Sequence, residues 1–480
     1  MPDVVLSAAE FEALQGELAD LRAVVVELTR VTDHQAERIK ELEARLAKNS
    51  RNSSTPPSRD GLNKPPPKSR REKGQRKPGG QSGHKGHHQP FSDTVDEHQA
   101  HAPEGQCNCG RAWSDAEQKV LSERRQVFDV IIKRHVTEHR IIESTCACGC
   151  VRRGEFPDDV QGPVSYGPTA LGAAVYLNQY QLLPVRRTAE CLTALGGIEM
   201  SASTVAHAVT RAAAALEAPV QAIRNAITQA SVAHADETGI RVAAGLHWLH
   251  VMSTPTLTAY FAHPKRGGEA LDAFGMLADF HGILVHDHWK AYLQYAIEHA
   301  FCNAHHLREL TAVAESGTHQ FWAIELIVLL CKAHRLTLEA QANGQPRLPD
   351  AQITAIQRDY DQLLSVGAAF NPENKPPPGT KRRVKQTPAF NLIKRLRAHR
   401  DETLRFLSDP RVPFDNNLAE RDLRMPKQRQ AISGCFRSQA GSQHFATVRS
   451  YFSTLRKQSA DLFQAIVETF RGQPPLPQLE

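Results

Sequence analysis

The sequence predicts a multidomain α+β protein, in which a helical N-terminal arm and a cysteine-containing module precede a mixed α/β core. Three observations predict this class. Apolar residues recur at alternating steps of four and three along residues 7–48, two cysteine pairs bracket a short segment within 107–150, and after about residue 230 the apolar pattern becomes strand-like. The 480 residues are enough for about three domains.

Residues 1–48 are predicted to form a coiled coil. Of ten successive a and d positions, only Thr32 and Gln35 are polar, which is typical of a coiled-coil seam. Self-association is the expected use, and packing against the body of the same chain is the alternative. The ten positions are Leu14, Leu18, Leu21, Val25, Leu28, Thr32, Gln35, Ile39, Leu42 and Leu46.

Residues 49–92 are predicted to be a flexible basic linker, because Pro, Gly, Ser and cations dominate and no apolar period is present. Residues 48–90 contain eleven Lys or Arg and only two acids, a charge of +9 in a chain whose net charge is +6. Such a block indicates a polyanionic partner; a solvated linker without a partner is the alternative. The candidate DNA-binding residues are Lys68, Arg70, Arg71, Lys73, Arg76 and Lys77.

Residues 93–160 are predicted to be a zinc-ribbon-like domain. The segment 119–144 between the cysteine motifs alternates well enough for two strands, and two thiolate pairs joined by a hairpin are the layout of a zinc ribbon. Unligated thiols are the alternative. The expected ligands of a structural Zn²⁺ are Cys107, Cys109, Cys146 and Cys148, with Cys150 as a substitute.

Residues 161–229 are predicted to be helical. A helix, a break at Gly196 and Gly197, and a second helix offered Ser201 and Ser203 as caps have the form of a helix-turn-helix. An ordinary helical hairpin explains the same pattern equally well.

Residues 230–440 are predicted to be the α/β core. Three strands with tight connections, a helix, and two further strands follow one another, which is the order expected of a ribonuclease-H-like fold. A helical insertion is expected at about 303–411, and a helical segment at 441–480 closes the chain. The expected strands are 230–242, 246–253, 257–263, 281–287 and 297–302, and the expected helix is 266–279.

Carboxylates mark the candidate site of this core. Asp236 and Glu237 are adjacent on a strand, so only one of them is expected to face a given site. Asp287 ends a buried strand that should lie beside the first, and two close carboxylates call for a hard divalent cation such as Mg²⁺. A third acid, Glu420, would come from the helix opening at "NNLAER", where Arg421 and Arg424 can meet phosphate.

The same helix has a structural explanation as well. Asn417 and Glu420 have the spacing of a capping box, and Asp236 and Asp287 could be ordinary turn or strand-end acids. We expect Asp415 to be a helix-start residue and Asp422 to be a surface charge.

Composition limits the class of protein. The chain is 41% hydrophobic and 23% charged, and its most apolar run, 321–330, contains Glu325 and is half the length of a membrane span of about 20 residues. No signal peptide is visible, and nine cysteines, an odd number, argue against a disulfide scaffold. We therefore expect a cytoplasmic protein with no membrane partner.

Across most of its length the sequence resembles the transposases of bacterial insertion sequence 66 (IS66). The resemblance rests on the order of several blocks: "KNSRNSSTPPSRD", "PGGQSGHKGH", the cysteine pairs, "ADETGIRV", "GILVHDHWKAY", "FCNAHHLREL" and "DNNLAERDLR". It implies a DDE-type transposase with Asp236, Asp287 and Glu420 as catalytic ligands of Mg²⁺ or Mn²⁺. It also gives Cys302 and His305 the spacing of a Cys-x-x-His element, for which bracing the site, touching DNA and packing in the core remain open. His286 and His288 have no assigned role.

The expected function is therefore DNA transposition. The protein would bind the terminal repeats of its element, cut a strand to leave a 3′-OH, and use that hydroxyl to attack target DNA. Double-stranded DNA, a second copy held through the coiled coil, and accessory proteins encoded by the element are the expected partners, and the bacterial nucleoid is the expected location. A non-catalytic DNA-binding regulator or an inactive copy is the alternative. A serine recombinase is disfavoured, because it needs an N-terminal catalytic domain with a nucleophilic serine.

Overall fold

The computed structural model describes residues 89–480, except 114–120, 122, 159, 161, 318, 377–383 and 480. It also describes seven positions of the N-terminal arm, from Val25 to Glu43. The chain divides into two compact units, residues 64–138 and residues 1–63 together with 139–480. None of the helices among the described residues is both long enough and apolar enough to cross a membrane.

The described positions of the N-terminal arm are helical and exposed. They include five of the ten predicted seam positions, among them Val25, Leu28 and Ile39, whose apolar side chains are each more than half exposed. The other seam positions and the six candidate cations of the linker lie outside the described residues. The coiled coil and the basic DNA contact therefore stay predictions.

The expected strands between the cysteine motifs differ from the structure. Among the described residues of 119–144 only the end forms a strand, β1 (Glu143–Thr145), and its antiparallel partner is β2 (Val151–Arg153), beyond the second cysteine motif. Alternation alone does not make a strand, because a strand needs a partner to bond. Here the tight turn at Cys146–Gly149 closes a short hairpin instead, and Val127 and Ile131 remain exposed.

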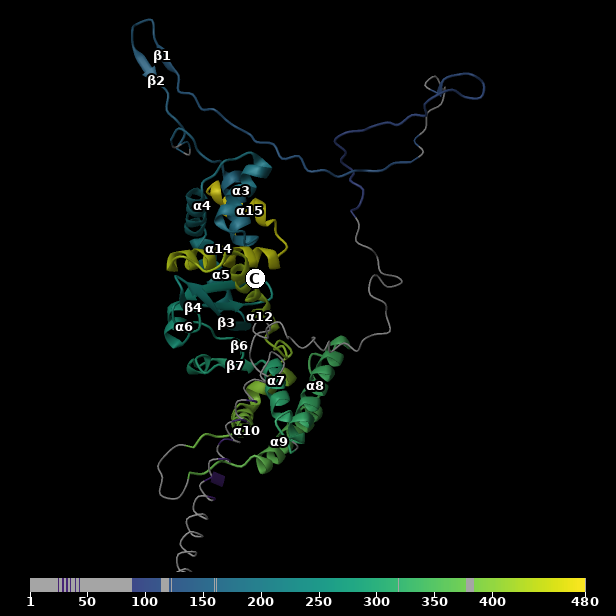
Figure 1. Cartoon of the computed structure of the whole chain (residues 1–480), viewed down its shortest axis with the longest axis vertical. Helices are drawn as coiled ribbons and strands as arrows, with labels where there is room; N and C mark the ends of the chain where they lie inside the picture. Colours follow the sequence, from purple (N-terminus) through teal and green to yellow (C-terminus); the bar gives the residue numbers. More distant parts are fainter. Residues whose placement is uncertain are drawn as a thin grey trace, which may run out of the picture. The chain divides into compact units, whose positions relative to one another are not determined.

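The predicted helical regions 161–229 and 441–480 pack together as one body (Figure 1). Gly197 adopts a left-handed φ of 61° and ends the first predicted helix, and the Ser201 hydroxyl accepts the Thr204 N–H at the start of the next, as expected. Leu171, Val205 and Phe452 share one core. The helices are α2 (Pro168–Val175), the π-helix η3 (Tyr176–Tyr180), α3 (Val185–Gly196), α4 (Ala202–Ala215), α5 (Glu217–Thr228), α14 (Gln439–Lys457) and α15 (Leu462–Phe470).

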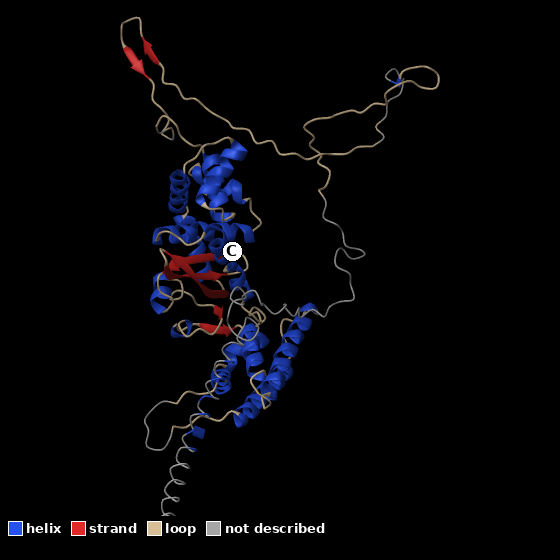
Figure 2. Ribbon diagram, in the orientation of Figure 1, coloured by secondary structure: helices blue, strands red, loops and turns tan. Residues whose placement is uncertain are grey.

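The core contains a five-stranded mixed sheet of order β5-β4-β3-β6-β7, with its first strand, β3, in the centre. Strands are drawn in red in Figure 2. β3, β4 and β5 pair antiparallel, while β6 and β7 run parallel to β3, which confirms the expected strand order. The strands are β3 (Val232–Val242), β4 (Gly245–Ser253), β5 (Thr258–His263), β6 (Ile283–His286) and β7 (Glu298–Phe301), and α6 (Gly268–Phe274) lies between β5 and β6.

Helix α14 protects the outer edge of this sheet. The Ser450 hydroxyl accepts the Tyr260 N–H at 2.8 Å, and the Thr454 hydroxyl accepts the Thr258 N–H at 3.0 Å. Backbone groups on the edge strand β5 are thus bonded by side chains of a helix, which is one way in which proteins prevent edge-to-edge association.

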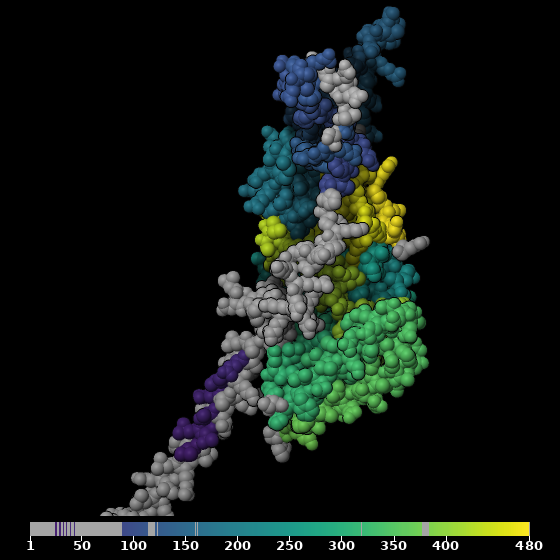
Figure 3. All heavy atoms as spheres, turned by 90° about the vertical axis from the view of Figure 1, so that its right-hand side faces the viewer, coloured from purple at the N-terminus to yellow at the C-terminus, as the bar shows by residue number. Residues whose placement is uncertain are grey.

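The predicted insertion is a helical lobe, seen as one green block in Figure 3, and its core continues into the sheet at Ile283, Val285 and Ala300. Gly367 is required here, because a Cβ at that position would lie 2.6 Å from the ring of the buried Trp322. The lobe contains α7 (Asn303–Ala314), α8 (Phe321–Ala342), α9 (Asp350–Phe370), α10 (Pro388–Ala398) and α11 (Arg400–Ser408), and the chain then returns to the sheet through α12 (Asn417–Asp422) and α13 (Arg424–Ser433).

Candidate active site

Two of the predicted acids meet at the carboxyl end of β6, beside the middle of β3. β3 and β6 pair with a constant offset of 51 residues, from Val232 with Ile283 to His234 with Val285. The same offset sets Asp236 opposite Asp287. Carboxylate oxygens of Asp236, Glu237 and Asp287 all lie within 4.8 Å of one another. The strand register therefore explains why acids 51 positions apart in the sequence form one cluster.

Glu237 belongs to this cluster, so the expectation that only one of Asp236 and Glu237 would face the site is wrong. Its Oε1 accepts hydrogen bonds from Arg266 Nη2 at 2.7 Å and Nε at 2.9 Å, and its Oε2 accepts the Tyr292 hydroxyl at 2.6 Å. Strand alternation describes where side chains leave the backbone, whereas the long Glu237 side chain is drawn toward these two partners. Glu237 thus connects the positive charge of Arg266 to the acid cluster.

The electrostatics of the cluster favour a cation. Burial raises the pKa of Asp236 well above its ordinary value, and the charges of Glu237, Asp287 and Glu420 raise it further. Burial also raises the pKa of Glu237 to about 7. Crowded carboxylates of this kind either hold protons or bind a hard divalent ion through oxygen. The residues present therefore fit Mg²⁺ or Mn²⁺.

A histidine pair organises the turn that carries Asp287. His286 Nδ1 accepts the His288 N–H at 3.2 Å, so its proton sits on Nε2, which donates to His299 Nδ1 at 3.1 Å. His288 has a left-handed φ of 72°, and the Trp289 N–H donates to Asp287 Oδ1 at 3.0 Å. His286, for which the sequence suggested no role, holds this turn in place.

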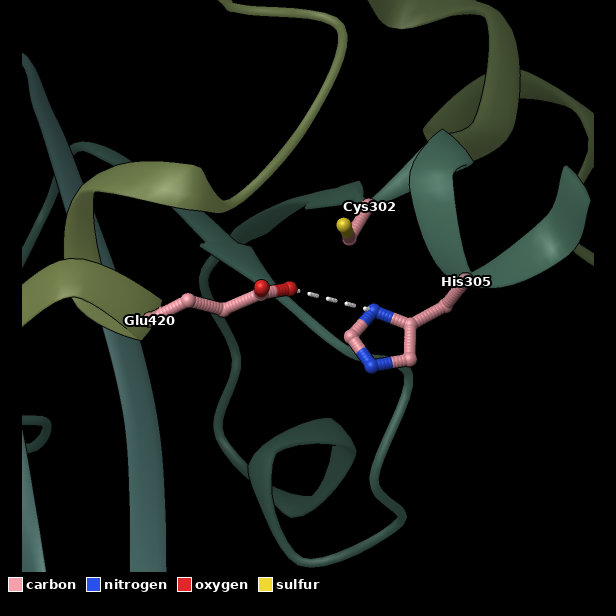
Figure 4. A group of neighbouring side chains, drawn as sticks. All are labelled: Cys302, His305 and Glu420. Carbon is pink, nitrogen blue, oxygen red and sulfur yellow. Dashed lines mark ion pairs between the residues drawn. The ribbon is translucent and has the colours of Figure 1, made fainter. Parts of the chain in front are cut away.

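The third predicted acid, Glu420, lies in a neighbouring cluster with Cys302 and His305 (Figure 4). Its Oε1 is 3.8 Å from His305 Nδ1 and 3.7 Å from Arg308 Nη2. Its charge nevertheless contributes to the raised pKa of Asp236, so the two clusters are neighbours. Glu420 contacts the Cys-x-x-His element directly, a partnership that the sequence did not predict.

The start of α12 is built differently from the predicted capping box. The N-cap is Asn416, one residue earlier than expected, and Asp415 accepts the Asn417 N–H at 3.0 Å, which confirms Asp415 as a helix-start residue. Asn416 is fully buried and does not cap with its side chain. The capping-box prediction is wrong because the Glu420 side chain points to His305 and Arg308 rather than back along its helix.

Asn416 instead ties the helix of Glu420 to the sheet. Its Nδ2 donates to the carbonyl of Ala235 at 2.8 Å, next to Asp236, and its Oδ1 accepts from His234 Nδ1 at 2.8 Å. Its backbone N–H donates to Cys302 Sγ at 3.2 Å. One buried amide thus links β3, the end of β7 and α12.

The prediction that Asp422 is a surface charge is also wrong. Its carboxylate forms an ion pair with Lys457 at 2.9 Å, with only 14% of the side chain exposed, and its carbonyl accepts the Tyr260 hydroxyl at 2.8 Å. Asp422 lies two residues after Glu420 and therefore faces another side of the helix, toward β5 and α14. Arg421 and Arg424 are exposed on the same stretch.

The two cysteine motifs form matching turns. The Cys107 N–H donates to the Arg111 carbonyl and the Gly110 N–H to the Cys107 carbonyl, both at 2.8 Å. The Cys146 segment repeats both bonds at 2.8 Å, and Gly110 and Gly149 have φ values of 84° and 85°. The motifs lie in different units, so a shared zinc site with Cys107, Cys109, Cys146 and Cys148 stays a prediction.

Hydrogen bonding in these turns favours thiolates. The Cys150 backbone and the Cys150 and Cys146 side chains lower the pKa of Cys148 to about 7. The pKa of Cys109 is lowered chiefly by the Arg111 backbone. Thiolates are the form of cysteine that binds metal.

The helix-turn-helix interpretation remains open. α3 and α4 have the expected succession, and α4 exposes Ser203, His207 and Arg211. Its opposite face packs into the helical body. An exposed face with few cations fits a simple helical hairpin as well as a DNA-reading helix.

Comparison with known proteins places these features in a family. A family described as "Transposase IS66 family" matches residues 163–444, a segment that includes Asp236, Asp287 and Glu420. A "Family of unknown function" (DUF6444) matches residues 5–90. The chain is also 25% identical over 310 residues to "Uncharacterized protein y4hP" of Sinorhizobium fredii (strain NBRC 101917 / NGR234). That alignment covers 55% of this chain and 52% of the relative, so the chain spans about half of the relative's length.

Proposed function

This chain belongs to the IS66 family of transposases, and from that membership we propose that it is a DDE transposase. In this proposal it binds the terminal repeats of an insertion sequence and carries out metal-dependent strand cleavage and strand transfer. The meeting of Asp236, in the middle of β3, with Asp287, just after the parallel strand β6, is the observation that carries it.

The topology supports the same proposal. A central first strand, an antiparallel meander on one side and two parallel strands on the other are the arrangement expected of a ribonuclease-H-like core. In open sheets of this kind, ligands bind beyond the carboxyl ends of the parallel strands. The acid cluster lies at that end.

In the proposed mechanism the chain supplies carboxylate oxygens and positive charge. Asp236, Asp287 and Glu420 would hold Mg²⁺ or Mn²⁺, whose chemistry at such a site is to activate an attacking oxygen and stabilise a leaving one. The backbone N–H groups of Glu237 and Trp289 orient the first two acids. The exposed Arg421 and Arg424 would contact the DNA phosphates.

The reaction needs no covalent protein–DNA intermediate. Water would first cleave a strand and leave a 3′-OH, and that hydroxyl would then attack a target phosphate and release a new 3′-OH. The nucleophiles are water and DNA, so the protein needs to position phosphate and to hold its carboxylates.

DNA binding is assigned to the parts that precede the core. The basic linker would supply cations for phosphate, and the cysteine turns contain the thiols predicted to ligate a structural Zn²⁺. The predicted coiled coil would bring two copies, and therefore two element ends, together.

The test is cleavage of duplex DNA that carries the element's terminal repeats, with and without Mg²⁺. We expect Mg²⁺-dependent nicking at the repeat ends by the parent protein and none by Asp287→Asn, with end binding retained by both. DNA binding without nicking by the parent in either Mg²⁺ or Mn²⁺ would identify a regulator or an inactive copy instead.

A further inference from the structure

We propose that Cys302, His305 and Glu420 form a second metal site, suited to Zn²⁺, whose occupation withdraws Glu420 from the Asp236–Asp287 cluster. The withdrawal rests on the proposed function, whereas the binding of Zn²⁺ does not. The site would make the enzyme sensitive to inhibition by zinc.

The three side chains converge from the start of α7 and from α12 (Figure 4). Cys302 follows β7 and precedes α7, His305 lies in the first turn of α7, and Glu420 comes from α12. One ligand atom from each, a sulfur, an imidazole nitrogen and a carboxylate oxygen, lies within 4.8 Å of the other two. A single cation at their centre can contact all three after small side-chain movements.

Two of these atoms lack hydrogen-bond partners. His305 Nδ1 and Glu420 Oε1 are both enclosed within the described chain, and neither forms a hydrogen bond there. They are 3.8 Å apart, too far for a hydrogen bond to each other. Enclosing polar atoms without hydrogen-bond partners destabilises the fold. A cation between them would remove this cost.

The ligand types select the cation. Thiolate and imidazole suit Zn²⁺, whereas Mg²⁺ prefers an all-oxygen set such as that of Asp236 and Asp287. Zn²⁺ binding would release the thiol proton of Cys302. Three protein ligands leave a fourth position for water.

Of two neighbouring groups, only the Arg308 side chain must move when the ion binds. The Asn416 N–H, which now donates to Cys302 Sγ, can stay bonded to a metal-bound sulfur. Arg308, 3.7 Å from Glu420, would have to turn away because its charge opposes the cation. Its side chain is 27% exposed and can do so toward solvent.

Zinc binding and the Mg²⁺ site exclude each other, because both need the single carboxylate of Glu420. Asn416, four residues before Glu420, bonds the Ala235 carbonyl next to Asp236, so the helix of Glu420 is tied to the strand that carries the acid cluster. When Glu420 is bound with Cys302 and His305, it is not available to the oxygen set. Zinc should therefore lower Mg²⁺-dependent cleavage while end binding continues.

The binding experiment counts zinc. The full-length parent, Cys302→Ser and His305→Gln are dialysed against a zinc buffer, and bound zinc per chain is measured. We expect each variant to hold one zinc fewer than the parent. The difference is independent of any zinc at the cysteine turns, which are unchanged. Cys302→Ser keeps an acceptor for the Asn416 N–H, and melting temperatures without metal check the fold.

The matched control is Cys331→Ser, which removes an exposed thiol from α8 and should leave the zinc count at the parental value. Equal zinc in the parent and both site variants would overturn the site.

A second experiment tests the exclusion. Mg²⁺-dependent nicking is measured with rising zinc, and each protein is compared with its own zinc-free rate. Loss of a metal ligand should weaken inhibition by at least about 10-fold, the lower range for loss of a supporting residue. Equal zinc sensitivity of the parent and Cys302→Ser would overturn the exclusion. A parent that never nicks DNA would refute the proposed function and the exclusion together, while the zinc count would still decide the site.

Discussion

The three candidate catalytic acids differ in how firmly their carboxyl groups are held. Asp236 accepts the Glu237 N–H at 2.8 Å and Asp287 accepts the Trp289 N–H at 3.0 Å. Glu420 has ion-pair partners only at 3.7 and 3.8 Å. It is therefore the acid whose position depends most on what else is bound.

Glu420→Gln should abolish most Mg²⁺-dependent cleavage while leaving DNA binding and melting temperature close to the parent. Loss of a residue that only supports a ligand costs about 10–100-fold, so loss of the ligand charge should cost more. Asp415→Asn is the control, because Asn caps helices about as well as Asp. If Asp415→Asn fails to cleave and Glu420→Gln still cuts, Asp415 is the catalytic acid.

Asn416→Ala should both destabilise the protein and slow cleavage. It removes the partners of His234 Nδ1 and of the Ala235 carbonyl, and each unmade buried bond costs about 1–3 kcal/mol. It also frees the start of α12, so Glu420 is held less well. Thermal unfolding and cleavage below the melting point measure the two effects. The exposed Asn417→Ala should have little effect on either, and equal effects of the two substitutions would contradict this role.

The acid cluster should make stability depend on pH and on Mg²⁺. Glu237 has its pKa raised from 4.5 to about 7, and the pKa of Asp236 is raised as well. The folded protein then binds protons that the unfolded chain has lost, so the free energy of unfolding falls as pH rises toward and past 7. Buried histidines such as His286, whose pKa is lowered, act in the opposite sense only below about 6.5.

The measurement is the melting temperature between pH 6.5 and 8 in EDTA and in Mg²⁺. The parent should lose stability with rising pH in EDTA and regain it in Mg²⁺, while Asp287→Asn should show smaller changes in both, since it removes one of the repelling charges. A Mg²⁺ effect of equal size in Asp287→Asn would show that the ion binds elsewhere.

At the scale of elements, the sequence predicted those strands that alternation and tight turns determine locally. Strands 230–242, 246–253 and 257–263 were expected within two residues of β3, β4 and β5, because alternation and tight turns act over short distances. The strands expected within 119–144 did not form among the described residues, apart from β1, because a strand needs a hydrogen-bonded partner. The packing of 441–480 against 161–229 was not predictable, since nothing local in either segment identifies the other.

In the candidate site, too, features set locally were predictable and features set by distant partners were not. Asp287 was visible in the sequence as an acid at a strand end, and the expected strand order made Asp236 and Asp287 neighbours. Glu237, Asn416 and Asp422 were misjudged or missed because their partners, Arg266, His234 and Lys457, are each distant in sequence. Side-chain direction in such cases is set by tertiary contacts, which periodicity does not encode.

Lys457→Met should destabilise the fold by about 3 kcal/mol, the low end for breaking a buried ion pair. Lys457 lies between Asp422 and the carbonyls of Thr254 and Leu257, so its loss leaves a half-buried carboxylate unpaired and loosens α12 from α14. Chemical denaturation measures the change. The exposed neighbour Arg456→Met is the matched control and should change stability by no more than about 0.5 kcal/mol.

A double variant decides whether the ion pair itself is responsible. Asp422→Asn combined with Lys457→Met should cost less than the sum of the single changes, because the unpaired charge is gone. Strict additivity would mean that Lys457 acts only through its carbonyl contacts.

At the scale of the whole molecule, the two family matches leave residues 91–162 between them. This interval contains both cysteine turns and joins the predicted DNA-holding arm to the acid cluster. The charge is also unevenly distributed, since residues 48–90 carry a net charge of +9 and the rest of the chain therefore carries −3. General attraction to DNA is therefore expected from the arm, and chemistry from the core.

Neutralising the arm should weaken DNA binding without regard to sequence. Each cation that faces a phosphate contributes about 0.9 to the slope of log affinity against log salt. Changing Lys68, Arg70, Arg71, Lys73, Arg76 and Lys77 to Gln should thus lower that slope by up to about 5. Binding is measured at several salt concentrations on duplexes with and without terminal repeats, and affinity should fall equally on both. Arg335→Gln with Arg358→Gln, which removes exposed cations from α8 and α9, should leave the slope unchanged. An arm variant with the parental slope would show that these six cations do not contact DNA, and that the attraction comes from residues such as Arg421 and Arg424 in the core.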